Sequence, residues 1–327
     1  MRTLKRLVKK LLLLVLSERD LIKCSFVLKR AFRTAHLLVF VYCSITSRLF
    51  KKPLGGGQYI QDSQDLRDSQ SPRIIFALTS FPARIATLHH TLFSLLRQST
   101  PADEIAVFLS LEEFPRGFAS LPRILRFLHT QHFIRLHFVE ANYKSCNKLI
   151  HALKFYTQDI CVTIDDDQLY ERDMLRLLLD SYRKYPQCIH THHADMPIRE
   201  SSGAFAWRAC ELEDTPLLGI CPLGVSGVLY PPHCLDTEVF NTQRFYELAP
   251  HNDDLWFFVM GMLKESKKVL VKGALGIPKQ PSIAIFESPN LWETNAKSGE
   301  NRFMIEWENL VRAYPQIGEI LYNHNMR

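Results

Sequence analysis

Residues 159–167 of the 327-residue chain, DICVTIDDD, place three aspartates directly after a run of apolar side chains. An apolar run of this length with polar flanks predicts a buried β-strand over 159–164. Adjacent carboxylates repel one another and resist burial, so Asp165, Asp166 and Asp167 are expected to meet positive charge where the strand ends. The stretch therefore predicts both the centre of a sheet and a polar site at its edge.

The sequence around this stretch alternates between strand and helix patterns. Strands are predicted over 73–79, 104–110 and 134–139, and helices over 85–98, 121–129, 148–155 and 171–185. This alternation predicts an α/β fold with a mixed, mostly parallel sheet and helices on both faces. Ligands in such folds bind beyond the carboxyl ends of the strands. Residues 79–84 and 165–167 are expected there, whereas the pattern becomes irregular after Tyr185.

Positive charge is concentrated in the first 55 residues. They carry 13 Lys and Arg against Glu18 and Asp20, a net charge of +11, whereas the rest of the chain carries −5. A main domain that binds nucleic acid would need a basic face of its own, so we expect no nucleic-acid partner. The eight cysteines form no CxxC pair, which favours reduced, buried thiols in a cytoplasmic protein over disulfides or a zinc site.

The first 55 residues are predicted to form a basic, amphipathic helical arm. Leucines and valines recur there at helical spacing, and Lys and Arg cluster on the other face. Such a helix can lie on an anionic membrane surface, although packing on the protein's own core is the alternative. The apolar runs are too short to span a bilayer. A polar linker over 56–72 and a main domain over 73–327 are expected to follow.

The residues alone leave two interpretations of the triplet open. At an extended strand end, Asp165 and Asp167 point the same way while Asp166 turns elsewhere. Paired carboxylate oxygens suit Mg²⁺ or Mn²⁺, which can neutralise a departing diphosphate. Alternatively, Asp167 could cap the helix predicted over 171–185.

Four segments in this order resemble the motifs of GT-A glycosyltransferases. They are TSFPARI (79–85), the aspartate triplet, GVLYPP (227–232) and NDDLW (252–256). The resemblance covers about residues 73–310 and is to bacterial family-2-like enzymes of surface-polysaccharide biosynthesis. It implies a metal-dependent transferase that moves a sugar from a nucleotide-sugar donor to a glycan or lipid-linked acceptor in lipopolysaccharide or capsule assembly.

The same resemblance implies two halves, with the donor on 73–185 and the acceptor on 186–327. The enzyme would lie at the inner face of the cell membrane. The residues expected to bind the nucleotide-sugar are Thr79, Ser80, Arg84, Lys148, Asp165 and Asp166. Asp167 and Asp165 would contact Mn²⁺ or Mg²⁺.

An inverting transferase needs a carboxylate that takes the proton of the acceptor hydroxyl. The resemblance gives this role to Asp254, with Asp253 as the other choice, although Asp254 could instead cap the helix predicted after it. Trp207, Gly227 and Trp256 are candidates for contact with acceptor or sugar. Gly227 could equally form an ordinary turn, and Trp256 fits the core better.

Two other functions compete with the transferase. A phosphatase of the haloacid-dehalogenase type also places Asp-x-Asp at a strand end. That fold needs its nucleophile after the first strand, whereas the triplet follows the fourth, and it needs Thr or Val two residues beyond the second Asp, where this chain has Leu169. A catalytically inactive membrane adaptor is the second alternative, which the intact Asp165, Asp167 and Asp254 disfavour.

Overall fold

The structure is a computed structural model that describes residues 72–201, 203–272 and 301–325. The predicted arm over 1–55, and the linker up to residue 71, lie outside the described residues, so both stay predictions. Within the described ranges, no helix is both long and apolar enough to cross a membrane.

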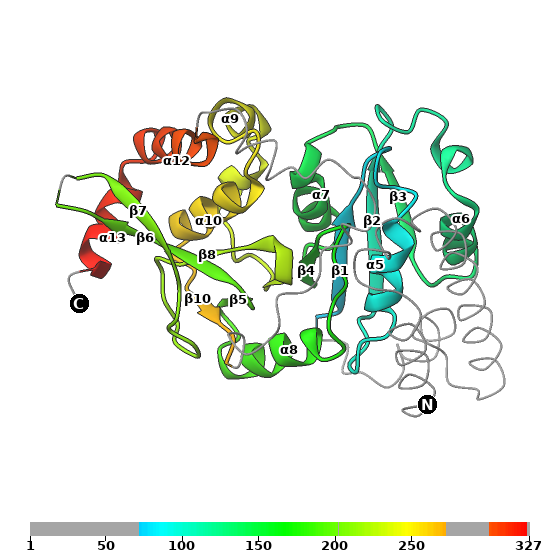
Figure 1. The fold of residues 1–327 in the computed structure, drawn as a ribbon, viewed down its shortest axis with the longest axis horizontal. Coiled ribbons are helices and arrows are strands. Elements are labelled where there is room, and N and C mark those ends of the chain that lie inside the picture. Colours follow the sequence, from blue (N-terminus) through cyan, green and yellow to red (C-terminus); the bar gives the residue numbers. More distant parts are fainter. Residues whose placement is uncertain (1–71, 202, 273–300, 326–327) are drawn as a thin grey trace, which may run out of the picture. The chain divides into compact units, whose positions relative to one another are not determined.

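A seven-stranded sheet carries the fold, with the order β10-β5-β9-β4-β1-β2-β3 (Figure 1). Its strands are β1 (Ile74–Thr79), β2 (Glu104–Ser110), β3 (Arg135–Val139), β4 (Ile160–Ile164), β5 (Ile189–Thr191), β9 (Val228–Tyr230) and β10 (Lys268–Leu270). The pairings β1–β2, β1–β4, β2–β3 and β5–β10 are parallel. Strand β9 runs antiparallel to both of its neighbours, β4 and β5.

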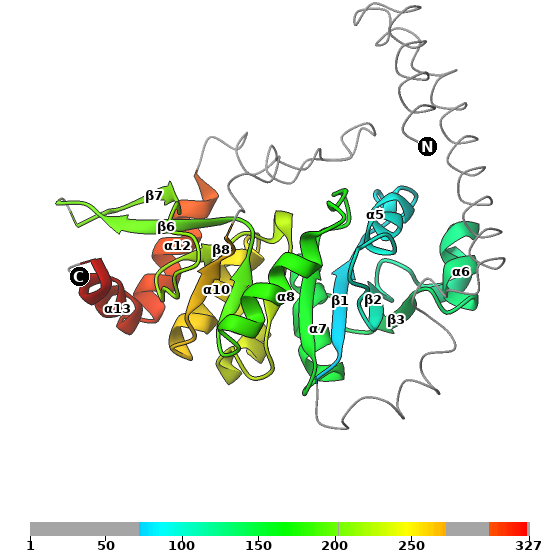
Figure 2. The same ribbon diagram turned by 90° about the horizontal axis from the view of Figure 1, so that it is seen from below.

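Helices cover both faces of this sheet, as predicted. The helices of the described residues are α5 (Leu88–Leu95), α6 (Arg123–Thr130), α7 (Asn147–Phe155), α8 (Met174–Lys184), α9 (Thr242–Leu248), α10 (Asp253–Leu263), α12 (Arg302–Ala313) and α13 (Gln316–Asn325), of which α12 and α13 pack on α10. Ile75 and Ala77 of β1 share a core cluster with α7 and α10, whereas Phe76 lies near Leu95 of α5. Side chains alternate across a strand, so these contacts place α5 and α7 on opposite faces (Figures 1 and 2).

The four predicted strands match β1, β2, β3 and β4 to within one residue at each end, and the helix predicted over 148–155 matches α7 equally well, but the helices predicted over 85–98, 121–129 and 171–185 start two or three residues before α5, α6 and α8. Helix α8 begins at Met174, with Asp173 at its N-cap position. The capping interpretation of Asp167 is therefore wrong. The segment between Asp167 and Met174 folds inward instead. The side chain of Tyr170 is buried, and its hydroxyl oxygen accepts a hydrogen bond from the backbone N–H of Asp165 at 2.9 Å.

The two predicted halves share the large sheet, since β5, β9 and β10 come from the second half. A small sheet lies beside it, in the order β7-β6-β8, from β6 (Ala194–Arg199), β7 (Phe205–Ala209) and β8 (Cys221–Pro222). Trp207 of β7 makes edge contacts with Phe258 of α10 and with Trp307 of α12. This aromatic packing joins the small sheet to the helices of the second half.

The cysteines of the described residues agree with the thiol prediction. Cys146, Cys161, Cys188, Cys210, Cys221 and Cys234 are free and buried. Burial raises the pKa of each of these thiols, which keeps them protonated and apolar in character.

The buried side chain of Lys268 makes the free energy of unfolding depend on pH. The ammonium nitrogen of Lys268 in β10 is fully enclosed, donates to the carbonyl of Leu218 at 3.0 Å, and lies 5.1 Å from the ring centroid of Phe258. Burial lowers the pKa of Lys268 to about 7. The unfolded chain keeps the ordinary, higher pKa, so it binds an extra proton above pH 7, and the folded state gains stability as pH rises through this window.

We expect this contribution to disappear in Lys268→Met. Between pH 7 and pH 9 the free energy of unfolding of the wild type should rise relative to the variant by ~2 kcal/mol. Urea unfolding at both pH values measures the difference, and titration of cysteines and tyrosines cancels because both proteins contain them. A wild-type minus variant difference that does not change with pH would contradict the prediction.

Candidate functional site

Strand pairing brings two of the predicted segments together. β1 and β4 are parallel neighbours, with Leu78 opposite Ile164. The loop after β1, which contains Ser80 and Arg84, therefore meets the aspartate triplet after β4. Both lie at the carboxyl edge of the sheet, where ligands of open α/β sheets bind.

Asp166 points into the protein and holds these two loops together. Its carboxylate accepts a hydrogen bond from the hydroxyl of Ser80 at 2.6 Å and another from Arg84 at 2.9 Å. Its backbone carbonyl accepts from the hydroxyl of Thr91 in α5 at 2.9 Å. Burial raises the pKa of Asp166, while the charge of Arg84 and the two hydrogen bonds oppose this rise. Ser80, Arg84 and Asp166 thus bind one another and support the triplet loop.

Asp165 and Asp167 remain partly open to solvent, with 28% and 30% of their side chains exposed. They do not share a partner, because Arg84 lies 2.9 Å from Asp167 whereas Asp165 pairs with Lys148. The expected shared face assumed that the strand continues through the triplet. The strand ends at Ile164 and residues 166–167 form a turn, so the two-residue alternation stops there.

Lys148 joins the triplet to the second acidic segment. Its ammonium nitrogen lies 2.6 Å from Oδ1 of Asp165 and 3.0 Å from Oδ2 of Asp253, and the residue is 5% exposed. Burial lowers the pKa of Lys148, but the charges of Asp165, Asp253 and Asp254 outweigh this and raise it well above its usual range. Lys148 is therefore a permanent cation between the end of β4 and the start of α10.

Asp254 has the electrostatic character of a base that works near neutral pH. Both of its carboxylate oxygens accept from the backbone N–H of Gly224, each at 3.1 Å. Burial and the neighbouring charge of Asp253 raise the pKa of Asp254 to about 7, against the opposing effect of Lys148. Its side chain does not cap α10, so the capping alternative is not what the structure shows.

Gly224 lies where these groups converge. A Cβ atom at this position would meet Asp254 Oδ1 at 3.0 Å, Lys148 Nζ at 3.2 Å and Asp165 Oδ1 at 3.5 Å. A side chain there would intrude among all three, so the backbone can approach Asp254 only because the residue is glycine. The bond between Gly224 and Asp254 joins segments thirty residues apart and was not predictable from the sequence pattern.

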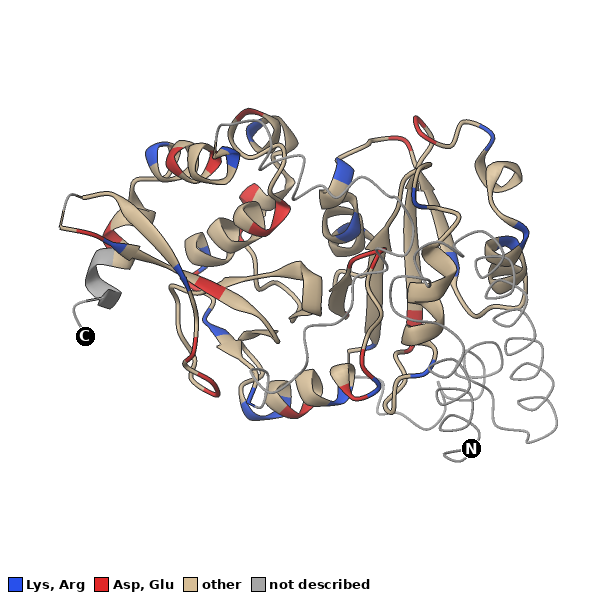
Figure 3. Ribbon diagram, in the orientation of Figure 1, with Lys and Arg blue, Asp and Glu red and all other residues tan. Residues whose placement is uncertain are grey.

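Negative charge exceeds positive charge at this edge of the sheet. Figure 3 shows acidic segments after β4 and at the start of α10, with basic positions on the neighbouring α7. The cluster has five carboxylates, those of Asp165, Asp166, Asp167, Asp253 and Asp254. Arg84 and Lys148 are its cations. Such an imbalance favours binding of a further cation or protonation of one carboxylate.

The donor atoms fit a hard divalent cation in part. Among the described residues, no group of three or more His, Cys, Asp or Glu side chains could hold a metal alone. Asp165 and Asp167 offer only oxygen atoms, and both are partly exposed. Mg²⁺ and Mn²⁺ in nucleotide sites are commonly bound through one or two carboxylates, with phosphates and water as the other ligands. These two aspartates fit that arrangement.

Thr79, Trp207, Gly227 and Trp256 lie apart from the acidic cluster in their contacts. The hydroxyl of Thr79 donates to the carbonyl of Phe108 in β2 at 2.8 Å. Trp256 is fully buried and its indole N–H donates to Val239, so its expected contact with sugar is corrected to a core role. Gly227 has φ of 88°, which explains a glycine at this turn.

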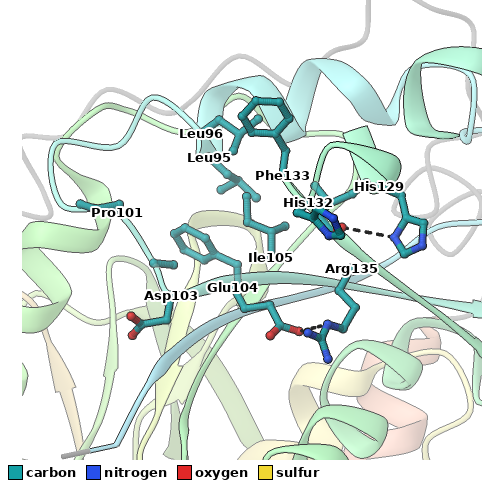
Figure 4. A pocket seen from close by; sticks show the side chains of 13 residues that line it. Leu95, Leu96, Pro101, Asp103, Glu104, Ile105, His129, His132, Phe133 and Arg135 are labelled. Carbon is teal, nitrogen blue, oxygen red and sulfur yellow. Dashed lines mark hydrogen bonds and ion pairs between the residues drawn. The ribbon is translucent and has the colours of Figure 1, made fainter. Parts of the chain in front are cut away.

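The pocket in Figure 4 lies at the opposite edge of the sheet. It is a small cavity of about 80 Å³ between α5 and the amino ends of β2 and β3, and the Glu104–Arg135 ion pair is at its wall. None of the predicted site residues lines it. The acidic cluster at the carboxyl edge remains the candidate site.

Comparisons with known proteins do not decide the function. No protein-family model and no curated protein sequence matches the chain. Among solved structures, 4-diphosphocytidyl-2C-methyl-D-erythritol synthase of Anaerococcus prevotii is 12% identical, with a TM-score of 0.40 over 70% of this chain and 97% of that chain. Residues 1–349 of S. aureus TarS in complex with UDP are 14% identical, with a TM-score of 0.39 over 60% of this chain and 57% of that chain. Likeness at this level carries no argument of its own.

The unequal burial of Asp166 and Asp167 gives a stability prediction. Asp166→Ala removes the acceptor of Ser80 and one of two carboxylates beside the buried Arg84, so we expect the free energy of unfolding to fall by ~3 kcal/mol. Asp167→Ala removes the more exposed partner of the same guanidinium and should cost ~1 kcal/mol or less. Urea unfolding of the two matched variants measures both. Equal losses of unfolding free energy in the two variants would show that Asp166 does not stabilise the loop more than Asp167 does.

Proposed function

We propose that this chain is a GT-A glycosyltransferase that moves a sugar from a nucleotide-sugar donor to an acceptor hydroxyl with inversion. One observation carries the proposal: the buried Lys148 pairs both with Asp253 at the start of α10 and with the partly exposed Asp165 after β4. A site for charged donor phosphates and a site for a base thereby lie on two sides of one cluster.

Asp254 acts as the base in this proposal. As the acceptor oxygen bonds to the anomeric carbon, its proton passes to the Asp254 carboxylate, and the bond from that carbon to the diphosphate oxygen breaks. The nucleoside diphosphate leaves with the bonding electrons. Because attack and departure occur on opposite sides of the sugar, the acceptor approaches from α10 and the diphosphate faces the end of β4.

Asp165 and Asp167 would hold Mn²⁺ or Mg²⁺, and the metal would neutralise the charge that develops on the departing diphosphate. Arg84 and Lys148 supply positive charge at the same edge and keep the two aspartates in place. A buried cation that is already oriented needs no rearrangement as charge develops.

The acceptor in this proposal is a glycan or a lipid-linked glycan of lipopolysaccharide or capsule assembly. The +11 charge of residues 1–55 supports a peripheral position on the anionic inner face of the cell membrane. The identities of the sugar and the acceptor depend on pocket shape rather than on these charged groups.

Nucleotide release tests the reaction. We expect the full chain, incubated with a panel of nucleotide sugars and Mn²⁺, to release nucleotide from one donor. Asp254→Asn and Asp167→Asn should each lower the rate at least ~100-fold, and a chelator should abolish it. Asp180→Asn, which changes an exposed carboxylate of α8, is the matched control and should keep the wild-type rate.

The other outcomes of this assay discriminate the competing functions. Phosphate release from sugar phosphates without donor preference would indicate a phosphatase. No nucleotide release and no nucleotide binding with a panel of acceptors present would indicate an inactive adaptor. Equal activity of Asp254→Asn and the wild type would remove Asp254 as the base.

The raised pKa of Asp254 predicts the pH dependence of turnover. A base must be ionised, so kcat/KM, which reports the pKa of the free enzyme, should increase about tenfold per pH unit below pH 7 and level off above it. An ordinary aspartate would be fully ionised by pH 6. Steady-state rates between pH 5 and 9, with circular dichroism to confirm that the fold persists, measure the profile. A plateau that extends down to pH 5 would contradict this assignment.

A further inference from the structure

Glu306 of α12 is a buried carboxylate that contacts the chain directly before the acidic pair. It is 5% exposed, and its Oε1 accepts from Nδ1 of His251 at 2.7 Å and from the backbone N–H of His251 at 3.3 Å. Its Oε2 accepts from the side-chain amide of Asn252. One side chain therefore binds both residues that precede Asp253.

These contacts replace the usual cap of α10. Asn252 is at the N-cap position, but its side chain makes no capping bond to its own helix. Asparagine at this position usually accepts from a backbone N–H of the first turn. Here the amide turns towards Glu306, so the direction in which the chain enters α10 is set by a side chain of another helix.

The acidic pair is consequently held from two directions. Lys148 contacts Asp253 and the N–H of Gly224 binds Asp254 on the side of the sheet. Glu306 holds the residues immediately before them from α12. Without Glu306, the start of α10 could shift, and the bonds from Lys148 and Gly224 would no longer meet Asp253 and Asp254 in one fixed position.

We propose that Glu306 is a positioning residue, which fixes the start of α10 so that the Asp253–Asp254 pair faces Lys148 and Gly224. This inference rests on the proposed function for its effect on turnover, but its structural content does not require that function. Glu306 acts through His251 and Asn252 and has no described contact with the reacting groups themselves.

A carboxylate is required because both oxygens of Glu306 face donors. Glu306→Leu keeps roughly the size of the side chain but offers no acceptor, so the donors of His251 and Asn252 both lose their partner. Asn252→Asp alone places two carboxylates against each other. The double variant Asn252→Asp/Glu306→Gln exchanges donor and acceptor between the two positions and restores the hydrogen bond.

The first test is a double-variant cycle on turnover. We expect Glu306→Leu and Asn252→Asp each to lower kcat by ~10- to 100-fold with the donor KM unchanged, and the double variant Asn252→Asp/Glu306→Gln to recover at least ~10-fold of the loss in Asn252→Asp. Glu308→Gln changes an exposed carboxylate on the same helix and should match the wild type. A double variant at least as slow as the worse single variant would overturn the proposal.

The second test does not depend on the reaction. Hydrogen–deuterium exchange should be faster by ~10-fold at the amides of His251, Gly224 and Trp256 in Glu306→Leu, because all three are bonded through the start of α10. Glu308→Gln should leave them unchanged. Equal exchange in the two variants would overturn the proposal, even if the wild type releases no nucleotide.

Absence of nucleotide release in the wild type would refute only the proposed function. Faster exchange in Glu306→Leu would then still support the positioning role. Uniformly faster exchange over the whole domain would show general destabilisation instead, and would count against a local role for Glu306.

Discussion

A buried ammonium group lies between two acidic segments that are far apart in the sequence. Removing the charge of Lys148 from water is costly, and the cost is offset only where carboxylates surround it. Asp165 arrives on the end of β4 and Asp253 on the start of α10, so these elements must be in place together before the charge is compensated. The requirement ties the donor side of the proposed site to the base side.

The same charge arrangement sets different properties for neighbouring carboxylates. Asp166 is enclosed beside Arg84 and Ser80, where it supports the loop. Asp165 and Asp167 are partly exposed beside the same cations, where they can meet a ligand. Asp254 is partly buried beside another carboxylate; both effects raise its pKa, so it accepts a proton more readily than an ordinary aspartate.

The sequence predicted what depends on local pattern. Apolar runs bounded by turns located β1 to β4, and the acidic residues after β4 and before α10 marked the edge where the cluster forms. The pairing of Arg84 with both Asp166 and Asp167 was not predictable, because it depends on where the strand stops and turns. Glu306 gave no signal at all, since an acidic residue in an amphipathic helix is normally a solvated one and its partners lie on a distant segment.

Strand β9 limits how segments of this chain could be recombined with segments of other proteins. It lies between β4 and β5 and hydrogen-bonds to both, so a strand from the second half covers the outer edge of β4, the last strand of the first half's part of the sheet. Recombination near residue 185 would separate the halves and expose the edge of β4 beside the aspartate triplet, and exposed edges invite wrong pairing. New acceptor specificities in this architecture would therefore arise more readily by changing surface loops than by shuffling whole halves.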